Sequence, residues 1–260
     1  MARWIAGLDG CRGAWAGVLL DLDDPGRHRA ALFSTVAECL DGPEAPVSVG
    51  IDVPIGLPDR ATGGGRAADR AARAYLGAGR SSVFPVPPRA AIFADDYETA
   101  KALSRAGSAP PFAPSIQCFN IFRYIRAVDA LLRERPALTA RLHEVHPEIA
   151  FRRLNGDRAL AAAKKGPQRQ AGLNLRRALL VAAGLPEALV HGARPRGVGA
   201  DDHLDAMAGL VVARDILLGR ASPLPDLPER DAHGLPAVIW MPAPLQGGDR
   251  PESREPGKVC

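Results

Sequence analysis

The sequence lacks the usual signs of a zinc knuckle, a disulfide framework or a membrane anchor. Its four cysteines are widely scattered and none belongs to a CxxC pair, so we expect reduced thiols in a cytoplasmic protein. The longest apolar run covers only 206–213, well short of the ~20 residues that a membrane-spanning helix needs. The N-terminal apolar run meets Asp9 before it is long enough for a signal peptide, and we expect no membrane partner.

Motifs of several common enzyme classes are missing too. No GxGxxG follows a predicted strand, and no nucleophile elbow is present. The glycines at 63–65 lack the spacing and the Lys-Ser/Thr pair of a phosphate-cradling loop. We also find no internal repeat. These absences argue against a dinucleotide-binding fold and against the commonest hydrolase patterns.

What the chain does have is an ordinary globular composition. Its 260 residues, 47% hydrophobic and 24% charged, suffice for one large domain or two small ones with a full core. The net charge of +4 is mild, so it permits a nucleic-acid partner without requiring one. Arginine far outnumbers lysine among many Ala, Gly and Pro residues, a bias typical of a GC-rich genome, so arginine content alone says little about function.

Hydrophobic patterning predicts alternating strands and helices. Strands are expected at 3–9, 14–21, 28–34, 47–54, 142–146 and 237–241. Helices are expected at 35–41, 66–77, 94–106, 115–134, 147–156, 168–183 and 201–218, with a proline-rich loop at 81–91. The first three strands form a meander, and the helical crossover after them makes the fourth strand parallel to the first.

Two aspartates end two of these strands in the same way. Asp9 closes the segment GLD (7–9) and Asp52 closes GID (50–52), each with a glycine two residues earlier on the same strand face. Neighbouring strands lie ~4.8 Å apart, so the two carboxylates would converge. Like charges at 4 Å repel by ~4 kcal/mol, unless a cation lies between them or one carboxyl is protonated. The alternative is that each aspartate caps the turn that follows it.

The predicted helix at 201–218 carries a further acidic group. Asp205 is the only polar side chain between 204 and 213, on a helix that is apolar almost all round and should therefore be buried. A lone buried carboxylate is costly unless it is paired or binds a metal. Asp202 and Asp201 can share its face, although capping and the helix dipole also account for them. Asp205 is the candidate ligand that capping does not explain.

The segment EVHPE (144–148) offers further candidates. Glu144 and His146 share a strand face, and Glu148 falls in the first turn of the next helix. Dipole stabilisation is the alternative for Glu148, and a helix cap or a satisfied core position is the alternative for His146. We expect His146 or Glu148 to act as an additional ligand or a proton carrier.

Basic residues gather near 66–89 and 164–177. Candidates for contact with a phosphate backbone are Arg12, Arg89, Lys164 and Lys165, and a solvated face is the alternative for each of them.

The order of these features resembles the ribonuclease H-like superfamily: a strand aspartate, a meander, a helix, an acidic strand end and an acidic late helix. DDHLDAMAG (201–209) resembles the last catalytic helix of Holliday-junction resolvases, whose two aspartates are three residues apart. Nearly the whole chain resembles a bacterial and archaeal family of unknown function labelled predicted ribonuclease H-like nucleases. The segments that carry this resemblance are GLDGCRGAW (7–15), GIDVPIGLPD (50–59), RAADRAARAYLG (66–77), SSVFPVPPR (81–89), EVHPEIAF (144–151) and DDHLDAMAG (201–209).

The resemblance implies an α/β fold with a mixed five-stranded sheet of order 3-2-1-4-5 flanked by helices. We expect one domain over 1–243, with a mostly helical insertion at about 60–135 and a flexible tail at 244–260. It also implies Mg²⁺- or Mn²⁺-dependent phosphodiester hydrolysis on a nucleic acid or nucleotide. The ligands of two ions ~3.5–4 Å apart would be Asp9, Asp52, Asp202 and Asp205. One departure is Asp52, where many nucleases of the superfamily carry Glu, and the shorter arm changes metal placement.

Two other functions stay open. Actin-like kinases use related folds, but they need two such domains and an adenosine pocket, whereas this chain has one predicted core. An interaction module for nucleic acid or protein, with a structural metal site, is the non-enzymatic alternative. The sequence leaves the substrate and the oligomeric state open, a homodimer included.

Overall fold

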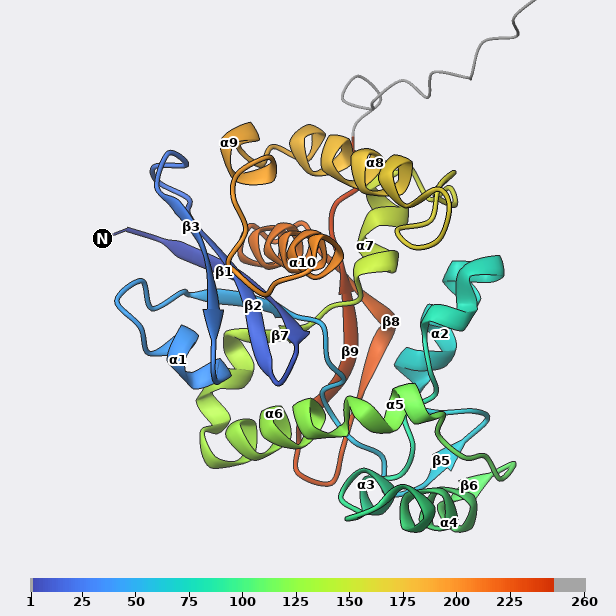
Figure 1. Ribbon diagram of the computed structural model, residues 1–260. Coiled ribbons are helices and arrows are strands. Elements are labelled where there is room, and N and C mark those ends of the chain that lie inside the picture. Colours follow the sequence, from blue (N-terminus) through green and yellow to red (C-terminus); the bar gives the residue numbers. More distant parts are fainter. Residues whose placement is uncertain (1, 246–260) are drawn as a thin grey trace, which may run out of the picture.

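A mixed five-stranded sheet with helices on both faces forms the centre of the computed structural model, which describes residues 2–245 (Figure 1). Its strands are β1 (Trp4–Cys11), β2 (Ala14–Asp21), β3 (His28–Phe33), β4 (Ser48–Ile51) and β7 (Leu142–Glu144). The predicted tail at 244–260 lies outside the described residues from position 246 onward.

The sheet order is β3-β2-β1-β4-β7. β1, β2 and β3 form an antiparallel meander, β4 pairs parallel with β1, and β7 pairs parallel with β4. The crossover through α1 (Val36–Leu40) explains why β4 runs parallel to β1. Since β7 is the fifth strand along the chain to enter this sheet, the predicted order 3-2-1-4-5 and the α/β class are confirmed.

The remaining elements lie around this sheet. The helices are α2 (Ala67–Leu76), α3 (Arg89–Ile92), α4 (Tyr97–Gly107), α5 (Ile116–Asn120), α6 (Phe122–Glu134), α7 (Pro147–Leu154), α8 (Arg169–Ala182), α9 (Glu187–Val190) and α10 (Ala200–Leu217), with 3-10 turns η1 (Gly77–Ser82) and η2 (Pro136–Ala140). Two small sheets are formed by β5 (Ala61–Thr62) with β6 (Ser108–Ala109), and by β8 (Ser222–Arg230) with β9 (Pro236–Met241). No helix within residues 2–245 is both long enough and apolar enough to cross a membrane.

Each face of the sheet has its own core. On one face, Leu8 and Ile51 pack with residues of α1 and α6. On the other face, Ile5 and Val18 pack with residues of α7, α8 and α10. Because both faces are covered, β1 and β2 are apolar along nearly their whole length rather than alternating with polar residues. The cysteines in the described chain (Cys11, Cys39 and Cys118) are buried free thiols.

α10 is the central helix of the molecule. It lies between the sheet strands β1 and β4 on one side and helices α7 and α8 on the other (Figure 1). Thirteen of its 18 residues are buried, which explains why its sequence is apolar all round. The predicted helix at 201–218 is confirmed, with its start one residue earlier and its end one residue earlier.

Two differences between the predicted and the observed elements concern residues 115–134 and β8. The single helix expected at 115–134 is divided into α5 and α6, because the backbone tightens at Ile121, whose N–H donates to the Cys118 carbonyl only three residues earlier at 3.2 Å. β8 was not predicted, since its prolines argue against a strand. It pairs with β9 alone, with a register shift between Leu224 and Glu229, and this irregular edge position tolerates proline.

Candidate functional site

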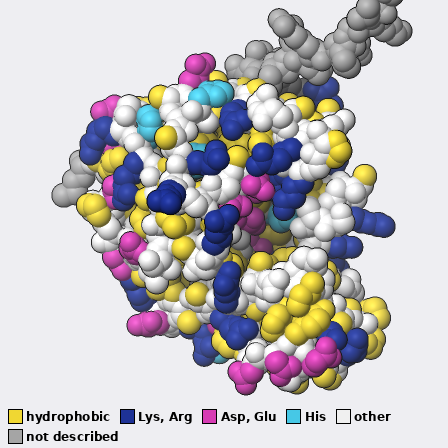
Figure 2. All heavy atoms as spheres, viewed as in Figure 1, with side chains coloured by type: hydrophobic (Ala, Val, Ile, Leu, Met, Phe, Trp, Pro, Cys, Tyr) yellow, Lys and Arg dark blue, Asp and Glu magenta, His cyan; other side chains and the backbone are white. Residues whose placement is uncertain are grey.

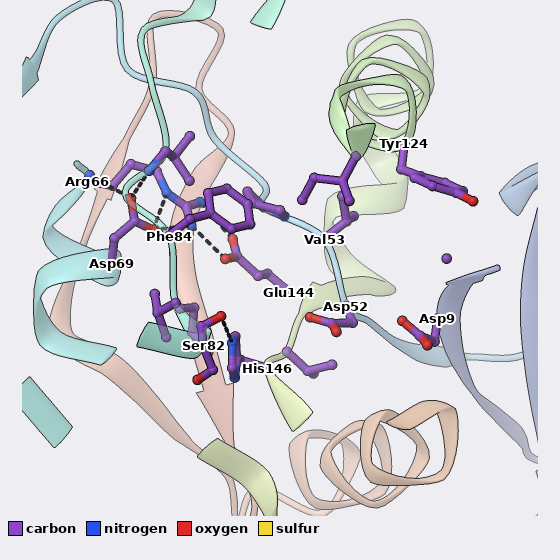
Figure 3. A pocket seen from close by; sticks show the side chains of 17 residues that line it. Asp9, Asp52, Val53, Arg66, Asp69, Ser82, Phe84, Tyr124, Glu144 and His146 are labelled. Atoms are coloured by element: carbon purple, nitrogen blue, oxygen red, sulfur yellow. Dashed lines mark hydrogen bonds and ion pairs between the residues drawn. The ribbon is translucent and has the colours of Figure 1, made fainter. Parts of the chain in front are cut away.

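Asp9, near the end of β1, and Asp52, directly after β4, come together on two neighbouring strands. Gly7 pairs with Gly50, and the Asp52 N–H donates to the Leu8 carbonyl at 3.0 Å, so the two aspartates lie level across the parallel strands β1 and β4. Figure 3 shows them side by side, with the Asp9 carboxylate aimed toward Asp52. No residue of the described chain donates a hydrogen bond to either carboxylate, so turn capping does not account for them.

The glycines that precede these aspartates let α10 approach the sheet directly. A Cβ on Gly7 would lie 1.8 Å from the Ala206 carbonyl oxygen, and a Cβ on Gly50 would lie 2.2 Å from the Gly209 carbonyl oxygen. Gly209 is in turn a glycine, and its own Cβ would lie 2.9 Å from the Gly50 oxygen. Backbone therefore packs on backbone at this crossing, and only glycine fits there.

This crossing brings the acidic end of α10 to the two strand aspartates. Asp205 is one helical turn before Gly209, is 6% exposed, and has a buried Oδ1 with no hydrogen-bond partner. Asp202 accepts from the Cys11 thiol at 3.2 Å and from the Gly199 N–H at 3.2 Å, so it also caps α10. Capping accordingly contributes to the role of Asp202 but does not account for Asp205, which lies beyond the first turn of α10.

Burial and the charges of neighbouring carboxylates raise the pKa values of Asp9, Asp52 and Asp205. Burial, followed by the charges of Asp52, Asp205 and Asp202, raises the pKa of Asp9 well above its ordinary value. Burial raises the pKa of Asp52 to about 7 and that of Asp205 to about 6, with the Lys164 ammonium opposing both shifts. Near neutral pH the group therefore resists full ionisation unless a compensating cation is present.

A lysine from the connection between α7 and α8 supplies positive charge to this group. Lys164 donates a short hydrogen bond to Asp205 Oδ2, and its Nζ lies 3.3 Å from Glu148 Oε1. Glu148 also pairs with the buried Arg176 through two bonds of 2.9 and 2.8 Å. Burial raises the pKa of Glu148, but the Lys164 and Arg176 charges outweigh it and leave the pKa lowered. Glu148 is thus held in its charged form beside Asp205.

Two adjoining hollows open beside Asp52. The first, of about 170 Å³, is lined by several acidic residues and by apolar or aromatic side chains that include Val53, Phe84 and Tyr124. The second, of about 530 Å³, is more basic and reaches Lys164, Lys165, Arg152 and Arg176. Asp52, Ser82 and His146 line both. In Figure 2, acidic side chains lie in a hollow in the middle of the face, with Lys and Arg side chains on both sides of it.

His146 lies across the first hollow from the strand aspartates (Figure 3). Its Nε2 is 3.2 Å from the Ser82 carbonyl oxygen, and a carbonyl can only accept, so Nε2 carries the proton. Burial lowers the pKa of His146, which keeps the ring neutral near pH 7. Nδ1 is buried and has no hydrogen-bond partner, so it remains an available proton acceptor.

Two other predicted candidates, Glu144 and Arg89, form ion pairs, although Glu144 also lines the first hollow. Glu144 is buried in an ion-pair network with Arg66 and Asp69, at 2.6 and 2.7 Å from the Arg66 Nη2, and this network joins α2 to β7. Arg89 pairs with Asp129 and Asp231, both at 2.7 Å, and thereby links α3, α6 and the β8–β9 connection.

Arg12 and Lys165 are exposed. Arg12 lies in the β1–β2 turn next to Gly13, whose N–H donates to the Tyr124 hydroxyl at 2.7 Å. The sequence analysis did not identify Phe84 and Tyr124 as site residues. Phe84 lies in a proline-rich segment, and Tyr124 lies among the apolar residues of a predicted helix.

The donors of the site can be compared with the needs of a divalent ion. They are carboxylate oxygens, which suit Mg²⁺ or Mn²⁺, and the buried Asp205 Oδ1 has no partner. In residues 2–245, no three His, Cys, Asp or Glu side chains are arranged closely enough to hold an ion as they stand. Lys164 supplies the local positive charge instead. The donor chemistry fits a hard divalent ion, whose binding would require Lys164 to move away and the carboxylates to draw together.

Comparison with known proteins gives a family but no characterised relative. A family model described as "Protein of unknown function (DUF429)" matches residues 7–230, a range that contains Asp9, Asp52, Asp202 and Asp205. Neither a search of curated proteins nor a search of solved structures gave a match. The sheet order agrees with a ribonuclease H-like fold. Because the family model covers most of the chain, the protein belongs to the DUF429 family of proteins of unknown function.

Proposed function

We propose that this protein hydrolyses phosphodiester bonds of a nucleic acid or nucleotide with the help of Mg²⁺ or Mn²⁺. The observation that carries the proposal is that Asp9, Asp52 and Asp205 converge from two strands and α10. Burial and the charges of neighbouring carboxylates raise the pKa values of all three. A fold retains such a group at a cost in stability, which indicates a functional cation site.

The ligands of the ion would be Asp9, Asp52, Asp202 and Asp205. When bound, it would supply activation of water and stabilisation of the leaving oxygen. Asp202 already accepts two hydrogen bonds, so we expect it to contribute more weakly than Asp205.

His146 is the better proton acceptor of the two candidates. It is neutral, its Nδ1 has no hydrogen-bond partner, and the residue lines both hollows together with Asp52. Glu148 has a lowered pKa and two basic partners, which make it a weak base. We therefore assign proton transfer to His146 and the positioning of Lys164 and Arg176 to Glu148.

The two hollows suit the two parts of a nucleotide. Aromatic and aliphatic side chains such as Phe84, Tyr124 and Val53 can contact the flat face of a base. The basic lining of the second hollow, with Lys164 and Lys165, can neutralise phosphate. This division supports a nucleic-acid strand or a nucleotide as substrate.

The test is cleavage by the purified full chain with Mg²⁺, Mn²⁺ or chelator. Substrates are single- and double-stranded DNA, RNA, branched junctions and nucleotides. We expect metal-dependent cleavage, with Asp9→Asn and Asp205→Asn each lowering the rate by about 100-fold or more. Asp226→Asn is the control, because Asp226 is exposed on β8 and lines neither hollow beside Asp52, so we expect it to leave the rate unchanged.

Three results would count against the proposal. These are no cleavage of any substrate with either metal, cleavage by the two site variants at the wild-type rate, and the same loss of rate in the Asp226→Asn control. Thermal stabilisation by ATP without stabilisation by DNA or RNA would favour the kinase alternative. Binding of nucleic acid without turnover in Mn²⁺ would favour an interaction module.

A further inference from the structure

A third hollow, lined by basic residues, lies on the other side of α10. It has a volume of about 290 Å³ and is lined by Arg177 of α8, His191 and Arg194 of the α9–α10 connection, and His203 of α10. At about 100° per residue, His203 is roughly 200° around the helix from Asp205. None of its lining residues lines the two hollows beside Asp52, so it is separate from the carboxylate site.

The charge of this hollow is one-sided. Two arginines and two histidines line it, and no Asp or Glu does. In residues 2–245, neither Arg177 nor Arg194 forms an ion pair with a carboxylate. Arg194 donates through Nε to the Val198 carbonyl at 2.9 Å, and Arg177 donates through Nη1 to Asn174 Oδ1 at 3.2 Å. Both guanidinium groups are thus held in place by neutral acceptors that do not cancel their charge.

His203 has a buried ring nitrogen without a hydrogen-bond partner. Its residue is 6% exposed, and its Nε2 is buried without a hydrogen-bond partner. A buried polar atom without a partner costs about 1–3 kcal/mol, and such atoms are uncommon in folded proteins. In the tautomer that carries the proton on Nε2, an oxygen acceptor in the hollow would give this atom a partner and would also meet the two guanidinium groups.

We propose that the hollow lined by Arg177, Arg194 and His203 binds a phosphate group, presented either by a nucleic-acid strand or by a free phosphate or nucleotide. Two arginines and one ring N–H match a tetrahedral anion with several acceptor oxygens. The site is on the helix that carries Asp202 and Asp205, so a strand source would extend the substrate contact around α10. That strand source rests on the proposed function, whereas the phosphate chemistry does not.

Binding measured in chelator tests this without relying on cleavage. Inorganic phosphate is titrated calorimetrically into the full chain, and a short labelled oligonucleotide is titrated by fluorescence anisotropy at several salt concentrations. We expect Arg194→Ala to weaken phosphate binding by roughly tenfold or more, and His203→Leu to weaken it by several-fold. Arg196→Ala is the matched control, because Arg196 is exposed in the same connection but does not line the hollow.

The oligonucleotide titration distinguishes a phosphate of a nucleic-acid strand from free phosphate or a nucleotide. If a strand occupies the hollow, Arg194→Ala weakens oligonucleotide binding and lowers the salt-dependence slope by about 1. If only phosphate binding falls, the ligand is free phosphate or a nucleotide. The proposal is overturned if the wild-type protein does not bind phosphate, or if Arg194→Ala and Arg196→Ala have the same effect. A protein that fails the cleavage test can still pass this one, so the two failures are distinguishable.

Discussion

Replacing Gly7 by alanine tests whether the close contact between β1 and α10 builds the site. The new Cβ would lie 1.8 Å from the Ala206 carbonyl oxygen and 2.4 Å from the Leu210 nitrogen, and both are backbone atoms that cannot rotate away. To reach an ordinary contact distance, α10 must retreat from the sheet by at least about 1 Å. That retreat would loosen packing along the whole helix and would move Asp205 away from Asp9.

The expected cost can be estimated from overpacking in other cores. Added methyl groups cost about 1–3 kcal/mol where neighbouring side chains can yield. Here the neighbours are backbone, so we expect about 3 kcal/mol or more. The reduced flexibility of the unfolded chain returns less than about 1 kcal/mol and does not change the sign. For a chain of this size, the loss corresponds to a fall in Tm of roughly 6–12 °C.

Urea denaturation of the purified variant measures this loss. Gly79→Ala is the control, because the nearest atom to its new Cβ is Leu76 Cβ at 3.8 Å and we expect almost no change. Gly209→Ala gives a milder version of the same clash, at 2.9 Å from the Gly50 oxygen, and remains informative if Gly7→Ala does not fold. A Gly7→Ala protein within about 0.5 kcal/mol of wild type would refute the reasoning.

Three further predictions concern charge. Burial raises the pKa of Asp52 to about 7, so the folded protein holds a proton that the unfolded chain releases near pH 4. In chelator, the free energy of unfolding should therefore fall as the pH rises from about 4 to about 7. Asp52→Asn should flatten that decline in urea titrations, and equal slopes would contradict the assignment. Arg66→Met should cost about 3–5 kcal/mol, because it leaves two buried carboxylates unpaired, while the exposed Arg70→Ala on the same helix should cost far less in the same assay. Lys164→Met should destabilise the metal-free protein near pH 7 and strengthen Mn²⁺ binding by calorimetry, because it removes the ammonium that competes for the carboxylates; unchanged Mn²⁺ affinity would contradict this.

Local patterns were enough to predict most of the sheet. The apolar runs of β1, β2 and β4 and the short crossover between β3 and β4 follow rules that depend only on neighbouring residues. The division of 115–134 at Ile121 and the proline-bearing β8 were missed. The first depends on a single local bond from the Ile121 N–H to the Cys118 carbonyl, which hydrophobic spacing does not reveal. The second depends on pairing with the adjacent strand β9, whereas the prolines of β8 argue against a strand.

Part of the candidate site could also be predicted from local sequence patterns. Asp205 stands out in any sequence window, since it is the one polar residue in a long apolar helical stretch. Glu144 was equally suggestive, but its partner Arg66 is 78 residues away, and that pairing makes it part of a buried network. The roles of Arg89 and His146 likewise depend on Asp129, Asp231 and the Ser82 carbonyl.

The sequence by itself determined which strands end in aspartate, which glycines precede them and which helix carries a buried acid, because these features repeat with the period of a strand or a helix. Only the tertiary structure decided which charges meet. Lys164 lies in an irregular connection with no period to interpret, yet it reaches Asp205 across 41 positions of the chain. Ion pairs depend on distances in space, and those distances follow from how α10 packs on Gly7 and Gly50.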